Sequence, residues 1–152
     1  MATALDDISD TDLGALGDLA GYHLRRASGA FAADFARALT GTGMRQVLFG
    51  IMSVVAANPG INQGAVGRSL GIQRANMVAL INELVDRGFV ERLVSKEDRR
   101  AFALTLSKAG KAMLAESLIR IRKHEEEMLS DLTADDRETL IALLTRVEAK
   151  ER

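Results

Sequence analysis

The chain has 152 residues, of which 47% are hydrophobic and 27% charged, and a formal net charge of −1. This length and composition are typical of one globular domain that is large enough to bury a core. The absence of cysteine excludes a disulfide framework, a thiolate metal site and a cysteine redox sensor. The N-terminus is acidic, unlike a signal peptide, and the most apolar run, residues 47–57, is too short to span a bilayer. We therefore expect a cytoplasmic protein with no membrane contact.

Positive charge is concentrated in the middle third of the chain. The formal net charge is −2 over residues 1–61, +4 over residues 62–111 and −3 over residues 112–152. Contact with phosphates depends on a local basic face more than on total charge. The charge distribution therefore favours a nucleic-acid partner for the middle third.

Two helices are predicted before this basic segment. Apolar residues at spacings of three to five indicate a long amphipathic helix from about residue 10 to residue 39, with Ser9 and Asp12 resembling a capping box at its start. Four glycines within it lower helix stability. A second helix over residues 44–57 is apolar nearly all round, which is typical of a buried central helix, and Asn-Pro-Gly ends it.

The basic segment begins with a helix-turn-helix pattern. Asn62 can cap a short third helix that ends at Leu70, and Gly71 is suited to the left-handed turn that follows. A fourth helix over residues 73–87 has an apolar face at helical spacing. The second helix of such a unit can enter the major groove of DNA. Its outward face presents Gln73, Arg74, Ala75, Asn76, Val78 and Ala79.

A charged hairpin and two more helices complete the chain. Strands are predicted at residues 90–94 and 102–106, and the loop between them is almost entirely charged, so its tip can reach a minor groove. Ser107 can cap a long fifth helix, and Thr133 with Asp136 resembles a capping box for a sixth. The expected fold class is mainly α, with six helices and a small β-hairpin wing.

These patterns together resemble the MarR-type (multiple antibiotic resistance regulator) family of winged helix-turn-helix regulators. The resemblance covers nearly the whole chain, and its most specific part is the Asp-Arg-Arg sequence at 98–100 followed by Leu-Thr-Leu-Ser at 104–107. It implies one integrated domain with an N-terminal dimerisation helix (1–43), a DNA-binding region (44–107) and C-terminal dimerisation helices (108–152). It also implies a symmetric homodimer bound to a double-stranded, pseudo-palindromic operator.

The start of the fourth helix carries residues that can read bases. Arginine can bind guanine through two hydrogen bonds, as asparagine can bind adenine, so Arg74 and Asn76 are candidates. Val78 and Ala79 stand where the family often has threonine and arginine. They offer only apolar contact, which leaves the base preference open. The competing interpretation is an ordinary solvated helix face.

The wing supplies the other candidates. Arg100 matches the family's wing arginine, suited to a narrow minor groove, and Asp98 matches the aspartate that orients it. Lys96 and Arg99 are expected to contact phosphates. Alternatively, Arg100 pairs with Asp98 or Glu97 in an exposed hairpin, a contact of little energetic value. The expected DNA-binding set is Gln73, Arg74, Ala75, Asn76, Lys96, Asp98, Arg99 and Arg100.

The resemblance also implies a small-molecule effector in a crevice between the DNA-binding region and the dimerisation helices. Residues 19–28 look similar to family members that answer to aromatic acids or their coenzyme A thioesters. Arginine can hold a carboxylate and aromatic rings can stack on the effector. Alternatively, these aromatic residues pack in the dimer interface and the arginines form a solvated face. The candidate set is Tyr22, His23, Arg26, Phe31 and Phe49.

Three classes of function were weighed. The sequence favours a ligand-responsive transcriptional regulator, a repressor released by its effector. The alternative is a winged-helix dimer that acts as a protein-interaction module without sequence-specific DNA binding. An enzyme is not expected, because no catalytic pair, phosphate loop or metal cluster stands at a recognisable spacing, and no cofactor or metal is expected either. His124, beside three glutamates, is better explained by a solvated helix face than by a metal site.

Overall fold

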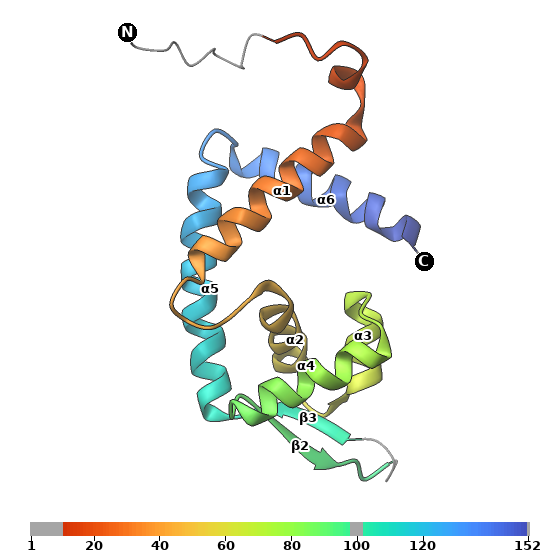
Figure 1. Cartoon of the computed structure of the whole chain (residues 1–152), viewed down its shortest axis with the longest axis vertical. Helices are drawn as coiled ribbons and strands as arrows, with labels where there is room; N and C mark the ends of the chain where they lie inside the picture. Colours follow the sequence, from red (N-terminus) through yellow and green to blue (C-terminus); the bar gives the residue numbers. More distant parts are fainter. Residues whose placement is uncertain (1–10, 98–101, 152) are drawn as a thin grey trace, which may run out of the picture.

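The computed structural model of the chain describes residues 11–97 and 102–151. These residues form six α-helices and a small antiparallel sheet (Figure 1), as the sequence predicted. No described helix is long and apolar enough to cross a membrane. The helices are α1 (Ala20–Ala38), α2 (Gln46–Ala57), α3 (Gln63–Leu70), α4 (Arg74–Asp86), α5 (Lys108–Met128) and α6 (Ala134–Glu148). The strands are β1 (Ile61–Asn62), β2 (Val90–Val94) and β3 (Phe102–Leu106).

Helix α2 is the centre of the hydrophobic core, which confirms the prediction of a buried central helix. Leu48, Ile51, Met52 and Val55 form one fully buried face of the helix, while Val47, Phe49 and Val54 are half-buried and Ser53, Ala56 and Ala57 are exposed. The covering side chains come from α3, α4 and the sheet: Val66, Met77, Ile81, Leu84, Val90, Leu104 and Leu106.

The sheet has the order β1-β3-β2, and β2 and β3 form the hairpin that the sequence predicted. Their register runs from Val90 opposite Leu106 to Val94 opposite Phe102. The third strand was not predicted. Strand β1 has only two residues, with Ile61 opposite Leu104, and two residues cannot show the alternation by which a strand is recognised.

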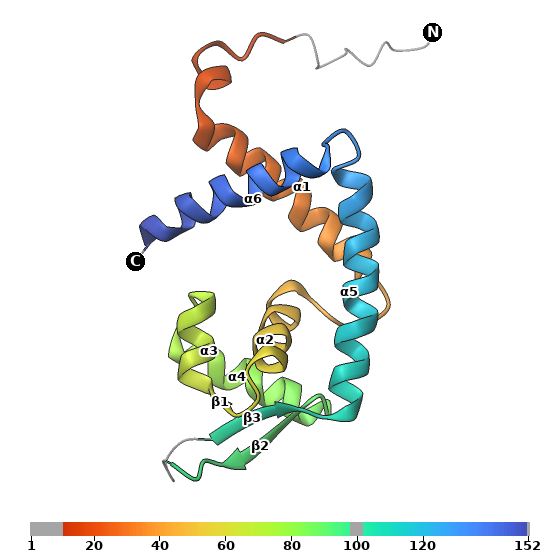
Figure 2. The same ribbon diagram turned by 180° about the vertical axis from the view of Figure 1, so that it is seen from behind.

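Helices α1, α5 and α6 extend away from this core as arms (Figures 1 and 2). Helix α1 packs along α5, where His124 Nδ1 lies 3.0 Å from Oδ1 of the buried Asp34. His124 therefore joins two helices, and the expectation that it lies on a solvated face is wrong. Thr133 and Asp136 form the predicted capping box at the start of α6.

The prediction of one helix from residue 10 to residue 39 is wrong in its first part. A short 3-10 turn covers Gly14–Asp18, Leu19 is extended, and α1 begins only at Ala20. Gly14 has a φ of +55°, which glycine adopts easily and which an α-helix does not contain. Leu13 occupies the N-cap of the 3-10 turn, and Asp12 Oδ1, one residue earlier, accepts a hydrogen bond from Gly14 N. Ser9 lies outside the described residues.

Candidate nucleic-acid interface

The helix-turn-helix is fixed by local backbone chemistry. Asn62 Oδ1 accepts a hydrogen bond from Ala65 N at 2.8 Å and caps α3, and Gly71 ends it in the left-handed conformation with φ 65°. Both features confirm the sequence prediction. A side chain at Gly67 would lie only 3.0 Å from Ile72 O and Met77 Cγ. This glycine therefore permits the close approach that sets α4 against α3.

Helix α4 has one buried face and one exposed face. Met77, Ile81 and Leu84 are at most 1% exposed and anchor the helix in the core. The four predicted DNA-contacting residues at its start, Gln73, Arg74, Ala75 and Asn76, are all exposed. Because Met77, Ile81 and Leu84 hold the helix by its inner face, its N-terminal turn and outer face remain accessible to a partner as large as a DNA duplex.

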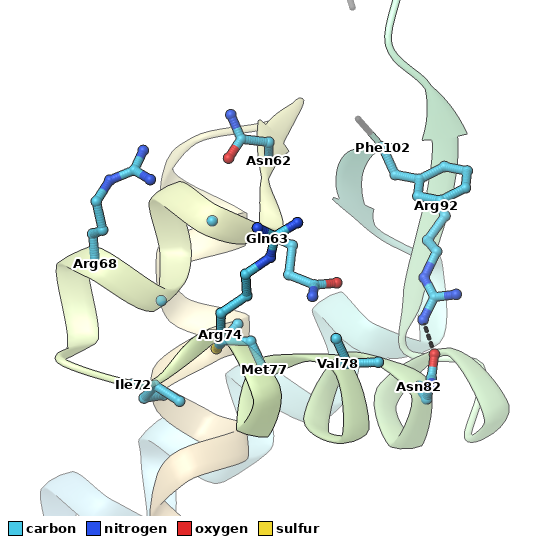
Figure 3. A pocket seen from close by; sticks show the side chains of 12 residues that line it. Asn62, Gln63, Arg68, Ile72, Arg74, Met77, Val78, Asn82, Arg92 and Phe102 are labelled. Carbon is cyan, nitrogen blue, oxygen red and sulfur yellow. Dashed lines mark hydrogen bonds between the residues drawn. The ribbon is translucent and has the colours of Figure 1, made fainter. Parts of the chain in front are cut away.

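A groove of about 750 Å³ lies between α3, α4 and the wing strands (Figure 3). Three arginines line it and, among the described residues of its lining, none is acidic. A concave surface with one sign of charge concentrates the field and attracts a polyanion. The lining residues are Asn62, Gln63, Gly64, Gly67, Arg68, Ile72, Arg74, Met77, Val78, Asn82, Arg92 and Phe102.

Arg92 connects helix α4 to the wing. Its guanidinium donates a hydrogen bond to Asn82 Oδ1 on α4 and lies 5.9 Å from the centroid of the Phe102 ring on β3 (Figure 3). The sequence reading did not select Arg92, Asn82, Gln63 or Arg68. Strand alternation could have identified Arg92. It lies two residues after the buried Val90 and is therefore on the same face of β2.

The wing tip carries the remaining predicted residues. Lys96 is exposed at the end of β2. Asp98, Arg99 and Arg100 lie outside the described residues, so their expected roles stay predictions.

The loop between α1 and α2 is tied to the C-terminal half of α4. Arg45 donates two hydrogen bonds to Glu83, at 2.7 and 2.6 Å, and Arg87 donates one to Gly43 O at 2.9 Å. The Arg45 guanidinium lowers the pKa of Glu83, chiefly through the hydrogen bond, and Glu83 raises the pKa of Arg45. These contacts hold helix α4 against the loop that links α1 to α2.

The predicted effector residues lie in two places. Tyr22, His23 and Arg26 form a cluster near the start of α1, in which Tyr22 is half-buried, the other two are exposed, and Arg26 Nη1 donates to Tyr22 Oη at 3.2 Å. Phe49 is on α2 and packs edge to face on Phe35, with ring centroids 5.7 Å apart. Tyr22 and Phe35 are thirteen residues apart on α1, which corresponds to about 20 Å of helix. Phe31, half-buried, lies one helical turn from Phe35.

Comparison with known proteins identifies relatives over nearly the whole chain. Residues 43–101 match the MarR family. A putative transcriptional regulatory protein for the hcr operon of Thauera aromatica is 32% identical over 145 residues, which cover 95% of this chain and 87% of the relative. The solved transcriptional repressor CouR bound to a 23-mer DNA duplex is 32% identical, with a TM-score of 0.86, over 91% of this chain and 99% of CouR. CouR bound to p-coumaroyl-CoA is 29% identical, with a TM-score of 0.77, over 91% and 98% of the two chains.

Proposed function

Because the chain belongs to the MarR family of winged helix-turn-helix transcriptional regulators and binds DNA, we propose that it is a homodimeric repressor of a pseudo-palindromic operator. We propose further that an aromatic acid or its coenzyme A thioester releases it from DNA. The family consists of regulators and not of enzymes.

The observation that carries the proposal is the arginine-lined groove beside the exposed start of α4. In this proposal α4 enters the major groove, where Arg74 and Asn76 bind base edges. The wing reaches the adjacent minor groove through Arg100, oriented by Asp98, while Lys96 and Arg99 contact phosphates. Gln73 and Ala75 lie at the same helix start and complete the contact surface.

The arms support a homodimer. Their large apolar side chains are exposed, and none of the residues of α6, all of which are described, is buried. An apolar surface of this extent marks an interaction site, and a second copy of the same arms would cover it. We infer that residues 1–43 and 108–152 dimerise while residues 44–107 bind DNA. The exposed apolar residues of the arms are Leu13, Leu16, Leu19, Leu24, Ile119, Leu140, Ile141, Leu143 and Val147.

The two separate clusters favour a long effector. Along α1, Tyr22 lies about 20 Å from Phe35, against which Phe49 packs, and this distance is more than a small aromatic acid spans. An aromatic acyl-coenzyme A is long enough to contact both. In that arrangement Arg26 binds phosphate and Phe31 and Phe49 pack on the aromatic acyl group. The likeness to CouR, solved with p-coumaroyl-CoA, supports this chemistry.

Release would follow from a shift between two dimer conformations. A ligand that binds one conformation better draws the population toward it, and recognition helices at the wrong spacing cannot occupy both half-sites.

The test of DNA recognition is fluorescence anisotropy with a duplex from the intergenic region upstream of the protein's own gene. Wild type and Arg100→Ala are titrated at two salt concentrations against excess random duplex. We expect tight, salt-dependent and competitor-resistant binding that the substitution weakens without unfolding the protein. Binding without salt dependence or preference over random DNA would support the protein-interaction module instead.

The same duplex tests the effector. We expect p-coumaroyl-CoA to release the protein, and p-coumarate or coenzyme A alone to be at least tenfold less effective. Arg26→Ala should raise the concentration needed for release, whereas Arg37→Ala, at another exposed arginine of α1, should not. Equal release by p-coumarate would contradict the long-effector assignment.

A further inference from the structure

The outer face of α4 carries an apolar patch in the middle of an otherwise polar reading surface. Ala75, Val78 and Ala79 are all exposed, and Val78 retains 47% of its accessible surface. Residues at i, i+3 and i+4 are neighbours on a helix surface, so these three side chains are contiguous. Arg74 and Asn76 border the patch toward the start of the helix.

This patch cannot read bases by hydrogen bonds. None of its three side chains has a donor or acceptor. The next polar residue along the same stripe is Asn82, four residues after Val78, and its Oδ1 already accepts the hydrogen bond from Arg92 (Figure 3). On this stripe, hydrogen-bonding side chains therefore flank the patch, in the first turn of α4 and at Asn82, and none lies within it.

The surroundings of the patch indicate what covers it. Val78 lines the same groove as Arg68, Arg74 and Arg92, as Figure 3 shows. A partner with an apolar surface would leave these three arginines without counter-charges, whereas the phosphates of a duplex complement them. In the major groove, the C5-methyl group of thymine is the apolar feature of the base edges.

We propose that Ala75, Val78 and Ala79 form a reader of thymine methyl groups in the interior of each half-site. This inference rests on the proposed insertion of α4 into the major groove. Arg74 and Asn76 bind the neighbouring base pairs, and the two alanines let the helix approach the base edges closely. A single exposed valine is common on protein surfaces. A β-branched residue is not a favoured choice for an exposed helix position, however, and here it is one of three contiguous apolar residues.

The experiment begins with in vitro selection of a preferred duplex from a random library by the full-length protein. Each thymine of that duplex is then replaced by deoxyuridine, which removes only the methyl group, and affinity is measured by anisotropy. We expect one or two thymines per half-site at which the replacement weakens binding about three- to fivefold, the effect of one buried methyl group. Replacement elsewhere in the duplex should have no effect.

Variants of Val78 assign the effect to the patch. Val78→Ala should weaken binding to the thymine duplex by a similar factor and should bind thymine and uracil duplexes equally. Val78→Thr keeps one methyl group and should discriminate between them to an intermediate degree. Affinity for random duplex serves as the control for folding, and it should be unchanged in both variants.

The outcomes separate this inference from the proposed function. A selected duplex at which Val78→Ala keeps the wild-type preference for thymine over uracil would overturn the methyl reader and leave the regulator intact. A selection that yields no preferred sequence would overturn both.

Discussion

The winged region and the arms use amphipathic segments in opposite ways. From Leu39 to Leu106, apolar side chains converge on α2 and form the buried core. In the arms, comparable side chains such as Leu16, Ile141 and Leu143 face outward, with 45, 65 and 50% of their surface exposed. The winged region thus buries its own large apolar side chains, whereas the arms leave several of theirs exposed. We therefore expect substitutions in the winged region to act on DNA binding directly, and substitutions in the arms to act on the proposed dimerisation.

The two regions are joined by the packing of Phe35, Met113, Leu114 and Ile121 against the core, and by local contacts at the ends of the winged region. Ser107 and Gly110 lie where β3 passes into α5, and Arg45 with Glu83 and Arg87 joins the loop before α2 to the recognition helix. Substitutions in the arms should therefore change oligomeric state and operator affinity. Substitutions at the junctions should change the free energy of unfolding, and those in the ion pair its dependence on pH.

The largest effect should come from the arms. Leu143→Asp places a charge in the exposed apolar face of α6, and we expect a monomer whose operator affinity is more than about 100-fold weaker, because binding to two half-sites at once is lost. Sedimentation velocity measures the dimer and anisotropy the affinity. Thr145→Asp, on the opposite side of α6, is the matched control and should remain dimeric. A dimeric Leu143→Asp would mean that α6 does not pair the arms.

Next in size is the junction between wing and arm. A Cβ atom at Gly110 would overlap the carbonyl oxygen of Phe89, a backbone atom that cannot rotate away. We expect Gly110→Ala to lower the free energy of unfolding by about 3 kcal/mol, as overpacking does. Gly29→Ala, on α1 where a Cβ would meet nothing within 4 Å, should raise it by up to about 1 kcal/mol. Urea denaturation of both variants checks the contrast, and equal effects would contradict it.

A smaller effect is expected at Ser107. Its Oγ accepts a hydrogen bond from Gly110 N at 3.0 Å and donates one to Gly88 O at 2.5 Å, so it caps α5 and ties it to the turn after α4. Ser107→Ala should lower the free energy of unfolding by about 2 kcal/mol, from one cap and one further hydrogen bond. Thr133→Ala removes a capping box in the arms, in which Thr133 Oγ1 accepts from Asp136 N and donates to Asp136 Oδ2. Because Thr133 is exposed and these bonds join no second element, the cost should be about half as large. A larger loss at Thr133 in thermal unfolding would contradict this order.

The smallest effect is expected at the ion pair. Because Arg45 holds the pKa of Glu83 below its ordinary value of 4.5, the stabilisation is present above that value and is lost as pH falls through the lowered pKa. The advantage of wild type over Glu83→Gln should be at most about 1 kcal/mol near neutral pH, and should be lost as pH falls below 4.5 and through the lowered pKa. Urea denaturation across pH measures this difference.

The control for this pair is Glu116→Gln, whose partner Arg120 lies on the same helix at 2.9 Å. Both residues lie on α5, and although Arg120 also donates to Thr40 O, neither contacts α4. Glu116→Gln should therefore change operator affinity less than Glu83→Gln does. Equal affinities for the two variants would show that the ion pair does not orient α4.

The sequence by itself determined the six helices, the two strands of the wing and most of their ends. Asn62, Gly71, Ser107 and Thr133 mark helix ends through local hydrogen bonds and backbone preferences, which need no distant residue. Alternation and charge likewise located the two strands of the wing. The exposed residues at the start of α4 followed from the helical period of its buried face.

Only the tertiary structure decided which distant residues meet. Local preference predicted a continuous first helix, but Gly14 and the extended Leu19 interrupt it before α1 begins. His124 approaches Asp34 across ninety residues, and Arg92 joins Asn82 to the wing. The effector candidates, grouped by residue type in the sequence, lie in two clusters on the folded chain. Such contacts depend on how helices pack, and packing is set by the whole core and not by the sequence around each residue.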